Sequence, residues 1–528
     1  MTARTLTLGG RAYPVILPNI RDPRLHVAAV IITVHVLGQV GLHFRVSIPQ
    51  ILAAILTCAI LEIALTFRQS RAFVWPASAM LTGSGVALIL RVVGTPPDEP
   101  WTIDGWQTFA VVAGLSLLTK YVIKYRGTHV FNPSNIGLVV AFVVLGSSRV
   151  EPLDFWWAPL NVWMLTAYAV IIVGGVLITR RLRLLTLAAA FWITLAAATG
   201  LLAASGHCMT ANWAFAPVCG VDFWRVIVIS PEVLIFLFFM ITDPKTVPPG
   251  AVGRTVFGCL VGVASALLIA PQTDEFGTKV GLLAGLVVIC AARPIVDRLV
   301  PAAGSEDDDL RRFASGAGVP SRSAPTLARR SARAGVAALL ALAAGLGVIA
   351  AGSPSRGPVA SVVDPAVAPP AVVDPATLPD ITVSDEVADY DPDLADGGIQ
   401  DVLLTLAQNL ELENQALLNG DADLLVRVDH GDRLAEMQAR LADAERSGIT
   451  AVTHFAFDTV DVSLLVPFGR QDGLSLGLMG RGTATEERYD ASGALLEREA
   501  SPFALTFAMR QATGARWLNV AVLPEGGE

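Results

Sequence analysis

Long apolar runs dominate the first two thirds of this chain and constrain its fold more than any other feature. A helix that crosses a membrane needs about 20 mostly apolar residues. The sequence contains eleven such runs, at about 26–44, 47–67, 73–93, 106–123, 134–147, 160–179, 184–205, 223–242, 254–270, 278–297 and 334–352. Only 16% of the residues are charged, against about 25% in soluble proteins, which excludes a soluble globular chain.

The positive charges between these runs predict how the chain crosses the membrane. With the N-terminus in the cytoplasm, the inner segments hold 22 Lys and Arg residues and the outer ones hold 5. Cytoplasmic loops are the ones enriched in Lys and Arg. We therefore expect a multi-pass protein of the cell (inner or plasma) membrane with a cytoplasmic N-terminus. Eleven spans then place the C-terminal part outside the cytoplasm.

Charge also separates two parts of the chain. Residues 1–354 hold 27 Lys and Arg against 17 Asp and Glu, whereas residues 355–528 hold 11 Arg against 29 Asp and Glu. A basic apolar body thus precedes an acidic polar domain. No basic cluster lies on a soluble fold, so the lipid bilayer is an expected partner and nucleic acid is not.

Composition divides the chain further. A segment rich in proline and alanine favours an extended linker, which cannot build a core. The predicted parts are a cytoplasmic N-terminal segment (1–25), a ten-span body (26–300), a basic cytoplasmic linker (301–333), an eleventh span (334–352), a Pro/Ala-rich linker (353–381) and an extracytoplasmic domain (382–528).

The last domain changes its hydrophobic period along the chain. Residues 397–445 have helical spacing, and strand-like runs follow at about 450–458, 460–467, 474–485, 501–511 and 516–523. Helices followed by a meander of strands predict an α+β domain with helices on a curved sheet. This order resembles the cystatin-like fold of the nuclear-transport-factor-2 type. The resemblance implies either a ligand cone or a dimer interface.

The ten-span body divides into two halves of five spans. An odd number per half forces the halves into opposite orientations, as in inverted-repeat transporters. Spans three and eight correspond, and both combine proline with small or polar residues: Pro76 and Ser78 in one, Ser230, Pro231 and Glu232 in the other. Broken helices at matching positions point to a site near the membrane midplane. Alternatively, proline and glycine are simply common in membrane helices. The fold class is thus an all-α polytopic membrane protein of two inverted five-helix halves plus an eleventh span, with an α+β domain.

Three ionisable residues within these spans are candidates for a functional role. A buried charge at bilayer depth is costly, so Glu232 should face a cavity, be paired or be protonated. Glu62 lies near the end of its span and could reach the interface. His35 lies deep in span one, where a packed or hydrogen-bonded histidine is favoured over a haem ligand. No metal-binding or nucleotide-hydrolysing motif is present in the sequence, so we expect no metal.

Cysteines agree with the two compartments. Three of the five lie in apolar spans, whereas Cys208 and Cys219 flank a segment on the predicted outer side. Because that compartment is oxidising, the pair predicts a disulfide. Two free thiols are the alternative.

The most specific string, residues 117–142, joins spans four and five. It carries Lys120, then Lys124 and Arg126, and enters span five through Phe131, Asn132, Pro133, Ser134 and Asn135. A proline at the first helical position and an Asn or Ser cap are ordinary helix-start features. The same helix start beside three cations could also bind an anion, such as a flavin phosphate or a lipid headgroup.

At this string the chain resembles the RnfD/NqrB family, the membrane subunits of ion-translocating, flavin-carrying electron-transport complexes. The matching features are Lys124, Gly127 and Phe131-Asn132-Pro133, the Pro-rich acidic loop in residues 87–101, and Thr242-Asp243-Pro244 before a Gly-rich span. They occur in order across about 25–300. The resemblance implies flavin binding by these segments, transmembrane electron flow and partner subunits of an electron-transport complex. It is closest to the actinobacterial UnbU-like branch found in enediyne biosynthesis clusters.

One departure from the family concerns the cofactor. Members with covalent FMN attach it to the threonine of S-G-A-T, which this sequence lacks. We therefore expect a non-covalent flavin (FMN or riboflavin), if any, with Phe155, Trp156 and Trp157 as stacking candidates or as an interfacial aromatic belt. Catalytic residues stay unassigned, and the chain could be one subunit of a membrane oxidoreductase. A redox-silent channel or transporter, and an anchor for an external binding domain, are the other two hypotheses.

Overall fold

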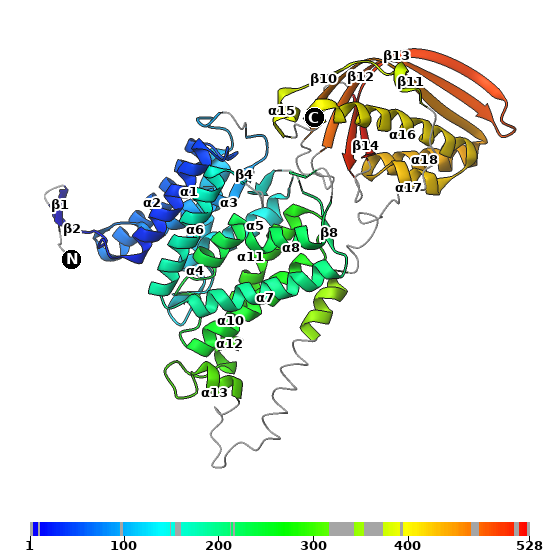
Figure 1. Ribbon diagram of the computed structural model, residues 1–528. Helices are drawn as coiled ribbons and strands as arrows, with labels where there is room; N and C mark the ends of the chain where they lie inside the picture. Colours follow the sequence, from blue (N-terminus) through cyan, green and yellow to red (C-terminus); the bar gives the residue numbers. More distant parts are fainter. Residues whose placement is uncertain are drawn as a thin grey trace. The chain divides into compact units, whose positions relative to one another are not determined.

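The protein forms two compact units, which are described separately. The computed structural model describes residues 4–8, 11–95, 99–147, 149–153, 160–211, 213–214, 217–315, 343–352, 373–390, 394–465, 475–511 and 517–524. The first unit, Met1–Met209 with Cys219–Arg356, is called the membrane body here. The second, Thr210–Val218 with Gly357–Glu528, contains the C-terminal domain (Figure 1).

Helices of the membrane body follow the predicted apolar runs. They are α1 (Pro23–Val40), α2 (Ile48–Ser70), α3 (Ala77–Ile89), α4 (Trp106–Val122), α5 (Pro133–Leu145), α6 (Val162–Arg181), α7 (Leu185–Ala204), α8 (Gly220–Ile229), α9 (Pro231–Ile235), the π-helix η1 (Phe236–Met240), α10 (Ala251–Ile269), α11 (Glu275–Ala291), α12 (Arg293–Leu299) and α13 (Leu310–Ser315). Residues 343–351 of the eleventh run are helical as well.

Six helical segments among the described residues are long and apolar enough to cross a membrane, or seven if the bent pair α11–α12 is one span. The protein is therefore a helical membrane protein. The helices α3 and α5 have 13 residues each and so extend about 20 Å, short of the roughly 30 Å hydrocarbon layer. These two helices therefore do not cross that layer by themselves.

Local breaks account for the departures from continuous spans. The apolar run at 223–242 is interrupted at Ser230, which caps α9, with Pro231 at its first position. The run at 278–297 bends by 61° between α11 and α12, where Pro294 opens the second helix. The N-terminal segment contains two strands, β1 (Arg4–Leu8) and β2 (Arg11–Ile16), which form a sheet with β3 (Phe73–Val74).

Several helix contacts among α1–α5 have counterparts among α6–α11, although α3 also contacts α4 and α5. In the first half α2 contacts α3 and α4, and α4 contacts α5; in the second, α7 contacts α8 and α10, and α10 contacts α11. Likewise α1 contacts α3, and α6 contacts α9. Two short strands, β4 (Leu90–Val92) and β7 (Val150–Pro152), pair beyond α3 and α5. The contacts among α1–α5 are thus partly repeated among α6–α11.

Loop contacts complete the body. A disulfide joins Cys208 and Cys219, which adjoin the short paired strands β8 (Cys208–Met209) and β9 (Val218–Cys219). Strands β5 (Lys124–Tyr125) and β6 (Thr128–His129) form the hairpin between α4 and α5. The start of the basic linker contacts the body, since Asp308 Oδ1 accepts a hydrogen bond of 3.0 Å from the amide of Val252 near the start of α10.

The C-terminal domain packs helices on one face of a curved five-stranded sheet (Figure 1). Its elements are η4 (Pro375–Thr377), β10 (Ile381–Val383), α15 (Asp385–Tyr390), the π-helix η5 (Leu394–Gly398), α16 (Ile399–Asn419), α17 (Ala422–Val428), α18 (Gly431–Ser447), β11 (Ile449–Leu465), β12 (Ser475–Asp490), β13 (Leu495–Gln511) and β14 (Trp517–Pro524). The strand order is β10-β11-β12-β13-β14, antiparallel except for β10 with β11.

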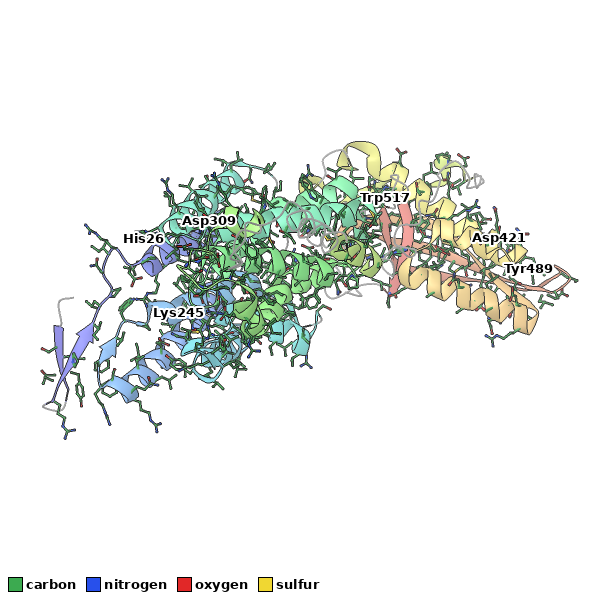
Figure 2. The ribbon with its side chains drawn as sticks, turned by 90° about the horizontal axis from the view of Figure 1, so that it is seen from below. His26, Lys245, Asp309, Asp421, Tyr489 and Trp517 are labelled. Carbon is green, nitrogen blue, oxygen red and sulfur yellow. A yellow bond between two sulfur atoms is a disulfide. The ribbon has the colours of Figure 1, made fainter. Side chains whose placement is uncertain are left out.

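Sequence signals explain most of these boundaries. Gly420 and Gly448, with φ of +68° and +70°, end α16 and α18, as expected for a residue without a Cβ penalty there. Asp490 Oδ1 accepts from the amides of Ser492 and Ala494 and so forms the β12–β13 turn. Tyr489 lies beside this turn (Figure 2). The two strands predicted at 450–458 and 460–467 form the single strand β11, with a register shift between Phe457 and Thr459.

Candidate functional site

A cavity of about 510 Å³ lies inside the membrane body. Five stretches line it: the start of α1, one face of α3, the start of α5 with His129, the end of α6, and the segment from Ile235 to Lys245. Two of these stretches contain the Asn132-Pro133 and Thr242-Asp243-Pro244 strings. They are about 110 positions apart in the sequence, so only the fold brings them together.

The start of α5 is fixed by Asn132. Its side-chain oxygen accepts from the amide of Asn135 (3.3 Å) and from the hydroxyl of Ser134 (2.8 Å). Its side-chain nitrogen donates to the carbonyl of Met240 at 3.1 Å. Asn132 therefore caps its own helix and also joins it to the chain end of the η1 helix. The residues that start and cap α5 therefore also line the cavity.

Asp243 links the segment after η1 to the α4–α5 hairpin. Its Oδ2 lies 2.9 Å from His129 Nε2, and its Oδ1 accepts from the amide of Lys245 at 3.0 Å. The hydroxyl of Thr242 donates to the carbonyl of Phe238. The Thr-Asp-Pro string thus terminates the broken span and places a carboxylate against a histidine from the α4–α5 hairpin.

Cationic and apolar groups occupy different parts of the lining. Lys245, labelled on the body in Figure 2, and Arg24 both line the cavity. Arg24 pairs with Asp22 at 2.6 Å, and its side chain stays 53% exposed, which places this pair near an opening. Elsewhere Phe238, Phe239 and aliphatic side chains form the wall. The cavity therefore combines an apolar interior with charged groups.

The short helices explain why a cavity can exist here. Non-helical backbone is tolerated at membrane depth only where protein buries it or where it lines a cavity. The starts of α3 and α5 and the end of η1 all adjoin this cavity. Breaks in the helices and the cavity are therefore parts of the same feature.

The predicted site residues separate into two groups. Those that line the cavity are Ser78, Asn132, Pro133, Ser134, Thr242, Asp243 and Pro244. Lys124, Arg126, Phe131 and Asn135 do not line it. The side chain of Arg126 is 68% exposed and lies 3.4 Å from Asp297, and Asn135 Nδ2 donates to the carbonyl of Leu283 at 3.0 Å. Of the three cations beside the helix start, Lys120 and Lys124 both lie over the ring of Tyr121.

Apart from Ser78, the candidate polar residues of the spans do not line this cavity. Pro76 precedes α3, and the Ser230 hydroxyl caps α9 by accepting from Val233 at 3.4 Å. The carboxylate oxygens of Glu232 are buried within the body. His35 Nε2 lies 3.2 Å from Ser84 Oγ, which is the packed, hydrogen-bonded arrangement. Phe155, Trp156 and Trp157 lie outside the described residues.

Glu62 forms an ion pair with a partly buried lysine on another helix. Its Oε1 lies 2.9 Å from Lys120 Nζ, and its Oε2 accepts a hydrogen bond from Tyr121. Lys120 Nζ also lies 3.4 Å from the hydroxyl of Ser78 on the cavity wall. Because 58 residues separate the two partners, no local spacing could have paired them.

A second buried charge group lies at β4, β7 and the start of α11. Glu275 pairs with Lys279 at 2.7 Å, and Arg91 lies 4.0 Å from Glu151. Lys279 Nζ also donates to the carbonyl of Leu153. Arg91 and Lys279 are two of the five cations in the predicted outer segments. Glu275 and Lys279 are four residues apart on one helix, a spacing visible in the sequence, whereas Arg91 and Glu151 come from separate strands.

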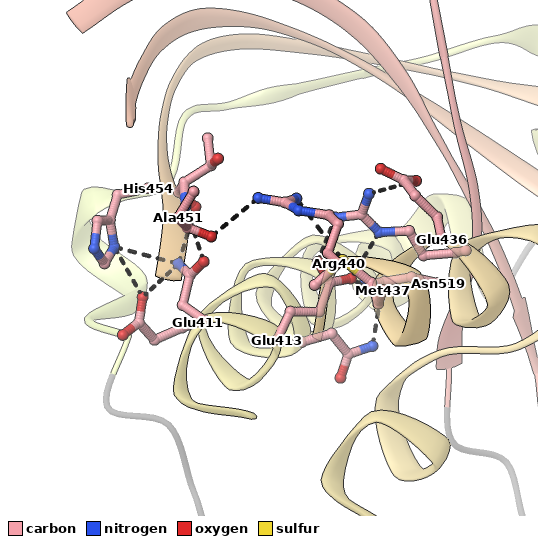
Figure 3. Close-up of polar contacts among 12 residues, drawn as sticks. Glu411, Glu413, Glu436, Met437, Arg440, Ala451, His454 and Asn519 are labelled. Atoms are coloured by element: carbon pink, nitrogen blue, oxygen red, sulfur yellow. Dashed lines mark hydrogen bonds and ion pairs between the residues drawn. The ribbon is translucent and has the colours of Figure 1, made fainter. Parts of the chain in front are cut away.

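The C-terminal domain has a polar cluster inside its apolar core (Figure 3). Arg433 Nε donates to Glu413 Oε1 at 3.1 Å, and its Nη2 donates to Glu413 Oε2. Asn519 Nδ2 also donates to Glu413 Oε1, at 2.7 Å. Asp429, whose carboxyl is buried, lies beside Glu413 and Arg433. Two acids and one arginine thus share a site largely closed to water.

Burial and the negative charge of Glu413 raise the pKa of Asp429 well above its usual value, against the opposing effect of Arg433. In the unfolded chain this carboxyl titrates near pH 3.9. The folded domain therefore holds a proton that the unfolded chain has lost, so its free energy of unfolding should fall as pH rises above about 4 towards the raised pKa. Asp429→Asn should remove this slope. Thermal unfolding of both proteins across that pH range tests it, and parallel curves would contradict it.

Comparisons with known proteins assign no family, since no protein-family model matches this chain and no curated protein matches it.

Proposed function

We propose that this protein is an RnfD/NqrB-like membrane subunit that supports transmembrane electron transfer, with a non-covalent flavin in the body cavity. The observation that carries the proposal is the meeting of the Asn132-Pro133 and Thr242-Asp243-Pro244 strings on one cavity. These strings are the ones on which the family resemblance depends.

The cavity fits such a ligand in size and chemistry. Its volume of about 510 Å³ lies within the roughly 300–1,000 Å³ usual for small-molecule sites. Phe238, Phe239 and the aliphatic wall suit an apolar ring system, whereas Arg24 and Lys245 suit a phosphate. A bound flavin would supply one- and two-electron redox chemistry. The protein would position it, exclude water and keep a proton between His129 and Asp243.

The remaining parts of the proposal concern architecture and partners. We propose ten membrane crossings in two inverted halves, with the short helices α3 and α5 completed by non-helical segments. The N-terminus would be cytoplasmic, and the C-terminal domain would be extracytoplasmic with a cystatin-like fold, which its helices on a curved sheet support. Electrons must enter and leave through other redox proteins, so companion membrane subunits belong to the proposal.

Extraction of flavin from the purified full chain tests this function. We expect visible flavin absorbance that appears in the supernatant after denaturation. Lys245→Gln should weaken retention of FMN about 10- to 100-fold, because a hydrogen bond to a charged group contributes roughly 1.5–3 kcal/mol. Lys124→Gln is the matched control, since Lys124 is exposed and does not line the cavity. A colourless protein that also fails to take up added FMN would refute the proposal.

A second function is favoured by the helix contacts that α1–α5 and α6–α11 have in common. Inverted-repeat transporters bind their substrates where broken helices from corresponding positions meet. In this protein α3 and the α9–η1 segment both line the cavity. A redox-silent transporter on the same scaffold would therefore account for a cavity that proves empty of flavin.

A further inference from the structure

The C-terminal domain contains a pocket of about 230 Å³ next to its buried polar cluster. Helices α16 and α18 supply one wall and the concave side of the sheet supplies the other. The helices and Thr453 at the edge of β11 contribute polar or charged lining residues: Glu413, Asn414, Arg433, Glu436, Arg440 and Thr453. The rest of the sheet contributes apolar ones: Phe455, Leu505 and Val522.

The two arginines of this pocket differ in their partners (Figure 3). Arg433 is matched by two carboxylates, because Glu413 accepts from its Nε and Nη2 and Glu436 accepts from its Nη1 at 2.9 Å. Arg440 donates from Nη2 to the carbonyl of Ala451 at 3.2 Å and from Nη1 to the sulfur of Met437 at 3.9 Å. Among the described residues, no carboxylate lies within ion-pair distance of Arg440.

The position of Arg440 is fixed by the edge of the sheet. Strand β10 pairs only with residues 460–462 of β11, so among the described residues the earlier part of β11 has a strand neighbour only on its β12 side. Side chains bind its other side: Asn414 exchanges hydrogen bonds with the backbone of Thr453 at 2.9 and 3.0 Å, and Arg440 binds Ala451. The guanidinium is thus held at the pocket wall with other N–H groups still available.

We propose that this pocket binds a small organic carboxylate with an apolar body. The planar guanidinium of Arg440 matches a carboxylate, and Phe455, Leu505 and Val522 provide the apolar contact. A volume of 230 Å³ is below the range for drug-sized ligands, so the ligand is a single ring or a short chain. The proposal stands independently of the function proposed for the membrane body.

Benzoate and its neutral analogue benzyl alcohol are the probes for this pocket. Saturation-transfer NMR on the full chain in lipid nanodiscs should show benzoate binding more tightly than benzyl alcohol. Arg440→Gln should weaken benzoate about 10- to 100-fold, while keeping a donor for Ala451. Arg446→Gln is the matched control, since Arg446 lies on the same helix, is 75% exposed and pairs with Asp443.

A second variant covers the case in which Arg440→Gln does not fold. Val522→Phe keeps Arg440 but fills the pocket from the apolar wall, so it should abolish benzoate binding. Equal benzoate affinity in the wild-type protein and either pocket variant would overturn the proposal. Binding of benzyl alcohol as tight as that of benzoate would also overturn it, because the guanidinium would then contribute nothing.

Discussion

Replacing Arg433 by methionine is expected to destabilise the C-terminal domain by about 3–5 kcal/mol, because it leaves a buried carboxylate without its cation. The side chains of Arg433 and Glu413 are 6% and 3% exposed. Both side chains are thus nearly closed to water outside the pocket that they line. Thermal or denaturant unfolding, followed by the circular dichroism of the β-sheet, measures the loss of stability.

Two further variants separate this effect from a general loss of arginine. Arg446→Met, on the same helix, removes an exposed ion pair, which contributes about 0–1 kcal/mol. Adding Glu413→Gln to Arg433→Met should recover part of the lost stability, since glutamine can still accept from Asn519 and carries no charge. A cost for Arg433→Met no larger than that of Arg446→Met would show that the buried pair does not stabilise the domain.

The sequence contains a signal for this buried pair, namely charged residues at apolar positions of two helices. Glu413 lies three residues after Leu410 and four before Leu417, on the apolar face of its helix. Arg433 lies four residues before Met437, which is itself buried. A charge at an apolar position is the mark of a buried polar site. The helical spacing was recognised, but the charges within it were not placed on the inner face.

Hydropathy located the helices of the membrane body well, because apolar runs of about 20 residues have few alternative structures. The apolar run at 134–147 already indicated a short α5, whereas Leu90, Val92 and Val93 extend the run of α3 and conceal where that helix ends. The break at Ser230 was visible, because proline after a capping residue starts a helix. The π-helix that follows depends on packing and has no such signal.

Long-range partners were the part that sequence could not supply. The cavity depends on Asn132 reaching Met240 and on His129 reaching Asp243, and neither distance is encoded locally. Resemblance of two strings to one family was the only hint that they belong together. The exposed position of Arg126 shows the limit of that hint, since neighbours in the sequence diverge in space.

Gly137→Ala should destabilise the membrane body by about 1–3 kcal/mol, the usual cost of overpacking a close contact. A Cβ at Gly137 would lie 1.6 Å from Ser116 Oγ and 3.0 Å from its Cα, so rotation of the serine alone cannot make room. Helix propensity predicts the opposite sign, a gain of up to about 1 kcal/mol. Thermal unfolding in detergent therefore decides which effect is larger.

Gly114→Ala in α4 is the matched control, because its Cβ would meet only side-chain carbons at an ordinary 3.4 Å. It should leave stability unchanged or raise it. Combining Gly137→Ala with Ser116→Gly removes the obstructing side chain and should restore stability. Since α5 begins at the cavity, a displaced α5 also moves Asn132 and Ser134 away from Met240 and Asp243. Gly137→Ala should therefore lose bound flavin together with stability. The double variant should regain both. A Gly137→Ala protein as stable as the wild type would show that α4 and α5 do not approach this closely.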